Sequence, residues 1–187
     1  GLMGGGFVRV VFLPEIPGDS IQASLTMVEG SPEEQTRATM RRLEEAALSL
    51  NGKFEFQDTE TNAVSTNVVD HFLVVSNNVA SGSAVIEMDK DVASQVDADL
   101  ITKYLLDFVG NMPGLKSLTF SSGTSFGGSA ISFQLVSSNT EQLIAASNEL
   151  EAKLRTYNGL INIKNEAVNN KDELRLSIKP QAEVMGL

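Results

Sequence analysis

The stretch Ser121-Ser122-Gly123-Thr124-Ser125-Phe126-Gly127-Gly128-Ser129 interrupts the apolar patterning of this 187-residue chain. It holds three glycines and five hydroxyl residues, a composition that the interior of a helix or of a central strand disfavours. Alternating apolar residues predict a strand over residues 115–120 before it and another over residues 130–136 after it. We therefore predict that residues 121–129 join two small α+β units.

The first unit opens with a strand and a helix. Apolar and polar residues alternate over residues 21–27, which is the period of a half-buried strand. Ser31 is expected to be the N-cap of the following helix, with Pro32 at its first position and Glu34 closing a capping box. Asn51-Gly52 ends this helical pattern.

Two strands, a second helix and a last strand complete the first unit. The apolar run at residues 72–75 is typical of a central strand, and residues 84–88 alternate as its antiparallel partner. A helix is expected from residues 97–99, where acidic side chains suit the helix dipole, to Pro113-Gly114. Residues 53–67 stay ambiguous between a short strand and a loop. The order β-α-β-β-α-β favours a ferredoxin-like α+β unit with its helices on one face of an antiparallel sheet.

The same pattern restarts after the joint. Residues 130–136 predict a strand, residues 139–157 a helix, and residues 161–163 and 174–178 two further strands. Pro180 is expected to open another helix, after which the sequence stops. The second unit therefore resembles a truncated copy of the first, and the chain is expected to be a fragment of a longer protein.

Bulk composition restricts the partners of the chain. Its net charge of -10 argues against nucleic acid and against an anionic membrane surface, because both attract clustered lysine and arginine. The absence of cysteine excludes disulfides and cysteine-based metal sites. No run of about 18 apolar residues exists, so no segment is predicted to span a membrane by itself.

No motif predicts an enzyme site, a metal site or a cofactor. The side chain of His71, the only histidine, should point away from that of its strand neighbour Asp70, so a surface role is expected. Gly127-Gly128 lacks the lysine of a phosphate-binding loop. Four acidic residues lack the spacing of a calcium loop and are expected to form a solvated turn and a helix start: Asp89, Asp91, Asp97 and Asp99.

Several segments in order resemble the periplasmic region that follows the seventh transmembrane helix of RND-superfamily, AcrB-like multidrug efflux pumps. The matching segments are Phe12-Leu13-Pro14-Glu15-Ile16-Pro17-Gly18-Asp19, Glu29-Gly30-Ser31-Pro32 with Thr36, Pro113-Gly114-Leu115-Lys116-Ser117-Leu118-Thr119-Phe120, Ile131-Ser132-Phe133-Gln134-Leu135, Tyr157-Asn158-Gly159-Leu160-Ile161-Asn162-Ile163, Glu173-Leu174-Arg175-Leu176-Ser177-Ile178-Lys179-Pro180 and Met185-Gly186-Leu187. The resemblance covers nearly the whole chain.

The resemblance implies a division into a membrane-proximal lead-in (residues 1–14), a first porter subdomain (15–120), the Gly/Ser joint (121–129) and the start of a second porter subdomain (130–187). It places the chain in the periplasmic portion of a Gram-negative inner-membrane proton antiporter. The parent would be a homotrimer with a periplasmic adaptor and an outer-membrane channel, and would meet the membrane only through flanking helices. Small amphiphilic substrates would enter between the two subdomains.

The resemblance also implies where substrates would touch the chain. Leu118, Phe120 and Ser122 match strand positions that line the cleft in the family, and Gln22 and Ser24 lie on the neighbouring strand. We expect Phe126 to plug or line the gap, with the joint acting as a hinge. Packing of Leu118 and Phe120 under the helices is the structural alternative. A free-standing ferredoxin-like module that binds a small ligand or a protein is the alternative function, and an enzyme is less favoured than either.

Overall fold

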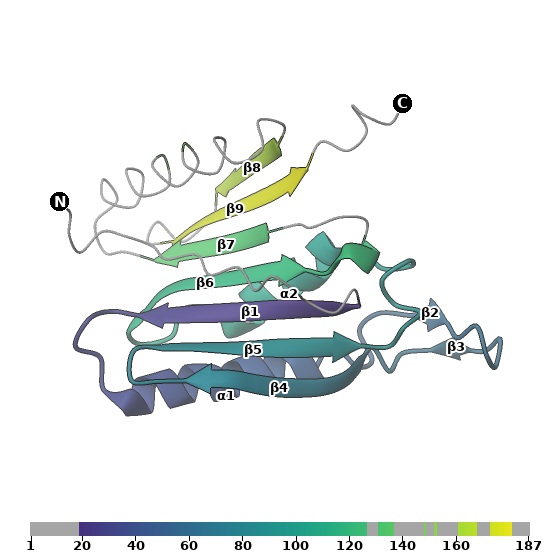
Figure 1. Ribbon diagram of the computed structural model, residues 1–187, viewed down its shortest axis with the longest axis horizontal. Helices are drawn as coiled ribbons and strands as arrows, with labels where there is room; N and C mark the ends of the chain where they lie inside the picture. The colour runs from purple at the N-terminus through teal and green to yellow at the C-terminus, as the bar shows by residue number, and fades with distance from the viewer. Residues whose placement is uncertain are drawn as a thin grey trace.

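The computed structural model describes residues 19–126 and the strands at residues 131–136, 161–167 and 173–180, together with two isolated helical positions, 148 and 152. The described elements are β1 (Ser20–Met27), α1 (Glu33–Leu48), β2 (Phe56–Gln57), β3 (Val64–Ser65), β4 (Val69–Asn77), β5 (Ser81–Met88), α2 (Ala98–Val109), β6 (Leu115–Ser122), a 3-10 turn (Thr124–Phe126), β7 (Ile131–Val136), β8 (Ile161–Ala167) and β9 (Glu173–Pro180) (Figure 1). The predicted lead-in, residues 1–14, lies outside the described residues.

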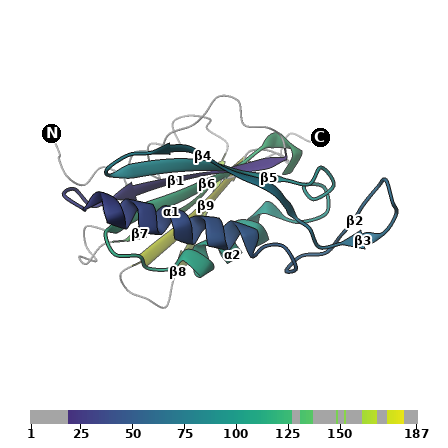
Figure 2. The same cartoon turned by 90° about the horizontal axis from the view of Figure 1, so that it is seen from below.

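One antiparallel sheet forms the body of the molecule. Its strands follow the order β4-β5-β1-β6-β7-β9-β8, and each pairs antiparallel with its neighbours. The central position predicted for residues 72–75 is wrong, because β4, which contains them, lies at an edge of the sheet. Helices α1 and α2 lie side by side on one face of the sheet (Figure 2). Strands β2 and β3 form a separate ribbon that projects beyond the end of the sheet. The fold is therefore α+β, as the sequence predicts.

The core lies between the helices and the sheet. Odd-numbered residues of β1 and the apolar stripes of both helices are buried there: Ile21, Ala23, Leu25 and Met27 from β1, Met40, Leu43, Ala46 and Ala47 from α1, and Ile101, Leu105, Leu106 and Val109 from α2. A Cβ on Gly82 would come within 2.7 Å of Met40 Cε, so this glycine lets α1 approach β5 closely.

The start of α1 corrects one prediction. The helix begins at Glu33 with Pro32 as its N-cap, and no side chain caps it. The Ser31 hydroxyl instead donates to the Val28 carbonyl at 2.6 Å within the preceding turn. Ser31 is therefore a turn residue, and the capping box predicted with Glu34 does not form, since the helix begins one residue later than predicted, with Pro32 as its N-cap.

The start of α2 agrees with the sequence. Asp97 is the N-cap, and its side chain accepts a hydrogen bond from the backbone N–H of Asp99 at 2.9 Å. This contact satisfies one of the free N–H groups at the start of a helix. Gly110, with φ of 61°, ends the helix, so the predicted end at Pro113-Gly114 is wrong.

The predicted joint is partly strand. β6 continues through Ser121 and Ser122, two residues beyond the predicted end at 120, because both pair with β1. Ser121 also pairs with Ile131, so β6 and β7 are neighbours in one continuous sheet. Residues 127–130 lie outside the described residues. The division at residues 121–129 and the hinge stay predictions.

The second half contributes three strands to the same sheet. β9 runs through Pro180, which pairs in register with Ile161. The prediction that Pro180 opens a helix is therefore wrong. Proline is tolerated at the last position of a strand where its missing N–H would have no hydrogen-bond partner. The helix predicted over residues 139–157 falls outside what the structure describes, apart from the helical positions 148 and 152.

Candidate functional site

A hydroxyl-rich set of seven side chains lies on the sheet face opposite the helices, and five of the seven are buried. Its centre is Gln22 and Ser24 of β1, because side chains alternate along a strand and the odd-numbered residues of β1 face the helices. Register places Gln22 between Val85 and Ser121, and Ser24 between Ser83 and Thr119. We call this set the hydroxyl face: Ser20, Gln22, Ser24, Ser83, Val85, Thr119 and Ser121.

Two polar atoms on the hydroxyl face are buried without a hydrogen bond. Gln22 is 2% exposed and Ser20 is fully buried. Within the described part of the chain, neither Gln22 Oε1 nor Ser20 Oγ has a hydrogen-bond partner. An unsatisfied buried acceptor costs about 1–3 kcal/mol, so such atoms are rare away from sites with a role in binding. Gln22 Oε1 is therefore a buried acceptor whose lone pairs no described group of the chain uses.

The six predicted site residues fall on two opposite faces of the sheet. Leu118, Phe120 and Ser122 pair with Leu25, Ala23 and Ile21, whose side chains face the helices. Leu118 and Phe120 are fully buried in the core. As the chain is folded here, these two side chains present no surface to a ligand, and they match the structural alternative stated above.

The remaining predicted site residues are Phe126 after β6 and Gln22 and Ser24 of β1. Phe126 is partly buried and packs against the core cluster from the turn after β6. Gln22 and Ser24 are the two predicted residues that lie on the hydroxyl face. The structure thus joins Gln22 and Ser24 in one surface and separates them from Leu118, Phe120 and Phe126.

Five members of the hydroxyl face are not among the predicted site residues: Ser20, Ser83, Val85, Thr119 and Ser121. Ser121 falls in the predicted joint. Thr119 was quoted only as part of a longer segment. The available signal was the alternation of hydroxyl residues in β6, where Ser117, Thr119 and Ser121 occupy every second position.

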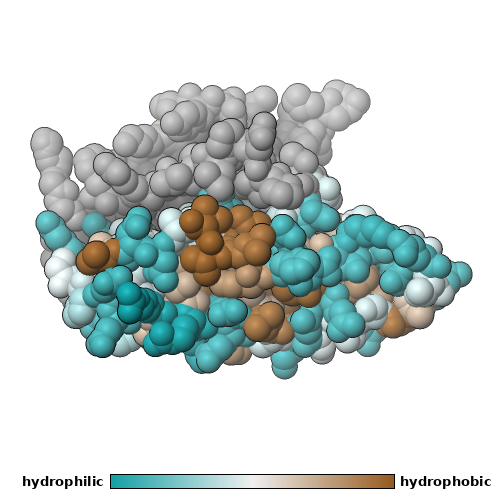
Figure 3. Space-filling model, turned by 60° about the horizontal axis from the view of Figure 1, so that its bottom comes forward, coloured by the Kyte–Doolittle hydropathy of each residue, from teal (hydrophilic) through white to brown (hydrophobic). Residues whose placement is uncertain are grey.

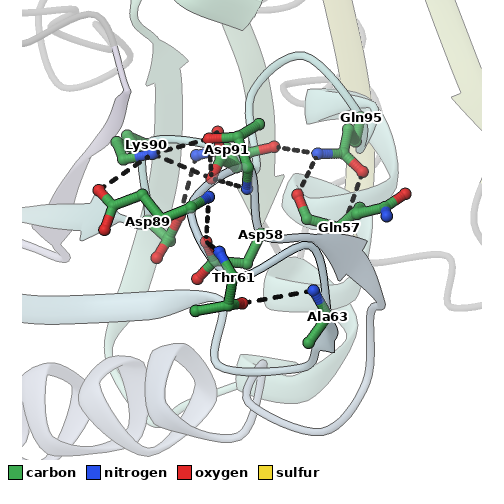
Figure 4. A network of polar contacts seen from close by, with 10 residues as sticks. Gln57, Asp58, Thr61, Ala63, Asp89, Lys90, Asp91 and Gln95 are labelled. Carbon is green, nitrogen blue, oxygen red and sulfur yellow. Dashed lines mark hydrogen bonds and ion pairs between the residues drawn. The ribbon is translucent and has the colours of Figure 1, made fainter.

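A polar network ties the β2–β3 ribbon to the body (Figure 4). The Asp91 carboxylate accepts hydrogen bonds from the Thr59 backbone N–H at 3.0 Å and from Lys90 Nζ at 3.2 Å. The Thr59 hydroxyl donates to the same carboxylate at 3.0 Å. These contacts hold the pKa of Asp91 below its usual range, and the bond to Asp91 raises the pKa of Lys90.

The acidic residues near this network serve structural contacts. Asp89 accepts from the Asp91 backbone N–H at 2.9 Å, and Asp97 caps α2. Among the residues that the structure describes, no group of three or more histidine, cysteine or acidic side chains could hold a metal ion. The turn and helix start predicted for Asp89, Asp91, Asp97 and Asp99 are confirmed, but the turn is not fully solvated as predicted, because Asp91 is buried.

His71 occupies an exposed position on β4. Its Nδ1 lies 3.4 Å from Glu87 Oε1 of the paired strand. Its neighbour Asp70 has a raised pKa because of burial and the nearby Asp89 carboxylate, an effect that His71 partly offsets. Neither residue lies on the hydroxyl face next to Gln22, and the surface role predicted for His71 is confirmed.

Comparison of the chain with known protein families, with curated proteins and with solved structures found no match in any of the three. Among the described residues, neither helix has the length and apolar character needed to cross a membrane.

Proposed function

We propose that this chain is part of the periplasmic porter region of an RND-type, proton-driven efflux transporter of amphiphilic compounds. The observation that carries the proposal is the order of its first four main strands, β4-β5-β1-β6. Helix α1 links β1 to β4 with antiparallel β5 between them, and α2 links β5 to β6 with β1 between them. This double split β-α-β arrangement is that of a ferredoxin-like subdomain, which the porter resemblance requires.

The hydroxyl face is the wall that this chain contributes to the substrate cleft. Its two half-buried members, Ser24 and Ser83, offer weak, interchangeable hydroxyl contacts, which suits recognition of varied amphiphiles. Gln22 Oε1 and Ser20 Oγ are acceptors without partners among the described residues, so a substrate that donates a hydrogen bond would offset their buried cost. The buried Leu118 and Phe120 support this wall from the core side.

The remaining parts of the transport cycle belong to the parent protein. Strands β7, β9 and β8 are the beginning of the second porter subdomain in this proposal. Proton-relay carboxylates would lie in flanking membrane helices, and the parent would be an inner-membrane homotrimer that works with a periplasmic adaptor and an outer-membrane channel. The chain itself is proposed to have no enzymatic activity and no cofactor.

The coding sequence on both sides of this stretch tests the proposal. We expect apolar segments of about 20 residues before Gly1 and after Leu187, each long enough to cross a membrane. We also expect that deletion of the parent gene increases cellular retention of a fluorescent amphiphile. A gene that encodes this stretch without apolar segments on either side would contradict the proposal.

One observation favours a second candidate, a free-standing ferredoxin-like interaction module. The edge strand β4 exposes apolar side chains, including Val74 at 50% exposure, which is suited to contact with another protein. The same coding sequence separates the two candidates, because a free-standing module needs no membrane segments.

A further inference from the structure

Strand β4 (Val69–Asn77) ends the sheet. It pairs with β5 on one side, and no strand of the described part of the chain pairs with its other side. An edge strand directs alternate N–H and C=O groups outward, where they can pair with another chain. β4 is nine residues long, so it lacks the protection against pairing that a very short edge strand has.

The middle of β4 is apolar and exposed. Leu73, Val74 and Val75 are 46%, 50% and 55% exposed, and Val79 just beyond the strand is exposed too. Residues 72–79 carry no charged side chain. The register shift between Val74 and Ser76 is a bulge that leaves Val75 as the extra residue, which turns consecutive valines toward solvent. Figure 3 brings this edge of the molecule forward and shows apolar surface gathered amid polar surroundings.

We propose that β4 is a self-association edge, which pairs antiparallel with β4 of a second copy of the chain around a two-fold axis at Val74. In that arrangement Val74 faces its own copy, and Leu73 faces Val75 of the other copy. Apolar residues therefore meet apolar residues along the centre, which is the pairing that stabilises neighbouring strands.

The charge of the chain favours a second copy as the partner of β4, and it favours antiparallel over parallel pairing. With a net charge of -10, two copies repel each other over most of their surface, and the uncharged centre of β4 avoids that repulsion. Antiparallel pairing about Val74 sets Asp70 opposite Asn78 and His71 opposite Asn77. Parallel pairing would set Asp70 beside its own copy, which is unfavourable for like charges.

The dimer is weak and reversible. Bulges between Val69 and His71 and between Val74 and Ser76 shorten the regular ladder that a second strand can form. The contact is therefore smaller than the roughly 1,600 Å² of a standard stable interface. This inference is independent of the proposed transport function, because it concerns the β4 edge and not the hydroxyl face.

Charged substitutions at the two-fold axis test the pairing by sedimentation equilibrium. V74K and V74E each place like charges directly opposite one another, so each is expected to weaken self-association at least about tenfold. An equal mixture of the V74K and V74E chains is expected to restore it, since opposite charges then meet. L100K is the control, because Leu100 is also 55% exposed but lies on α2.

Two results would overturn the proposal. One is a wild-type chain that stays monomeric at high concentration. The other is a V74K chain that associates as strongly as wild type while its circular dichroism is unchanged. Failure of the mixture to associate would refute the antiparallel register centred on Val74.

A cysteine variant tests the same axis without altering charge. The chain contains no cysteine, so V74C carries a single thiol. Antiparallel neighbours directly opposite have Cα atoms about 4.5–5.5 Å apart, which is within disulfide reach. V74C is expected to oxidise to a covalent dimer much faster than the control L100C. Equal rates for the two variants would refute the proposal.

Discussion

The side-chain amide of Gln95 makes the two hydrogen bonds to Gln57 that a neighbouring strand would make. The Gln57 backbone N–H donates to Gln95 Oε1 at 2.7 Å, and Gln95 Nε2 donates to the Gln57 carbonyl at 2.9 Å. Strands β2 and β3 pair through two residues each, which is too little for independent stability. The ribbon therefore depends on Gln95 and on the Asp91 network for its position.

Q95L is expected to release the β2–β3 ribbon. Removal of the amide leaves both Gln57 backbone groups to water, at a cost of about 1 kcal/mol in the free energy of unfolding, because the contacts are partly solvated. Hydrogen exchange at the Gln57 amide should become faster, while the amides of the central strand β1 stay protected. Unchanged exchange at Gln57 would show that the ribbon is held by other contacts.

D91N is expected to have a lower free energy of unfolding than wild type at neutral pH. At acidic pH the two chains are expected to differ little. Because the folded pKa of Asp91 lies below its unfolded value of about 3.9, its ionised form stabilises the fold above that value. This stabilisation is lost as the pH falls through the folded pKa. Urea unfolding across that range should show the gap between D91N and wild type closing toward acid. A gap that stays constant would contradict the assignment.

Gly114 and Gly30 form a matched pair for backbone strain. Both have a positive φ, 81° and 88°, but a Cβ at Gly114 would collide with the Gln35 side chain and lie 2.9 Å from the Ser31 hydroxyl. A Cβ at Gly30 would meet nothing within 4 Å. G30A should cost about 1 kcal/mol of unfolding free energy. G114A should cost somewhat more, because the Gln35 side chain can move aside but the Ser31 hydroxyl is held by its bond to Val28. Equal costs in chemical unfolding would refute the steric contribution.

F120A separates a core role from a cleft role. Phe120 is fully buried among apolar side chains, so its truncation should lower the free energy of unfolding by about 3–5 kcal/mol. S24A, on the hydroxyl face, should change it by less than about 0.5 kcal/mol. A small effect of F120A would indicate that Phe120 is not a packed core residue.

Local sequence signals predicted the elements whose ends are set by nearby residues. The acidic residues 97–99 predicted the start of α2, where Asp97 is the N-cap. The start of α1 was displaced because Ser31 bonds to Val28, a choice between two short-range partners that spacing does not settle. β6 runs past its predicted end because Ile21 pairs with Ser122, and such pairing depends on distant residues.

The candidate site was less predictable than the fold. Alternation in β1 put Gln22 and Ser24 on one face, but the burial of Gln22 depends on the folded chain and not on its neighbours in sequence. Leu118 and Phe120 were grouped with Gln22 by family position, although register separates them onto opposite faces. The β2–β3 ribbon escaped prediction because Gln95 and Asp91, more than 30 residues away, hold it.

Q22L tests the ligand-binding role of the hydroxyl face most directly, by combining unfolding with a titration followed by NMR. Gln22 Oε1 is buried without a partner among the residues that the structure describes, so the substitution should leave stability unchanged or raise it by about 1 kcal/mol. In the wild type, deoxycholate and the cationic dye crystal violet should shift the Gln22, Ser24 and Thr119 resonances in a saturable way, while the Gln57 amide on the ribbon stays unchanged. Q22L should weaken that binding. Absence of shifts on this face, or a Q22L chain that loses stability and binds as wild type does, would contradict the proposed role.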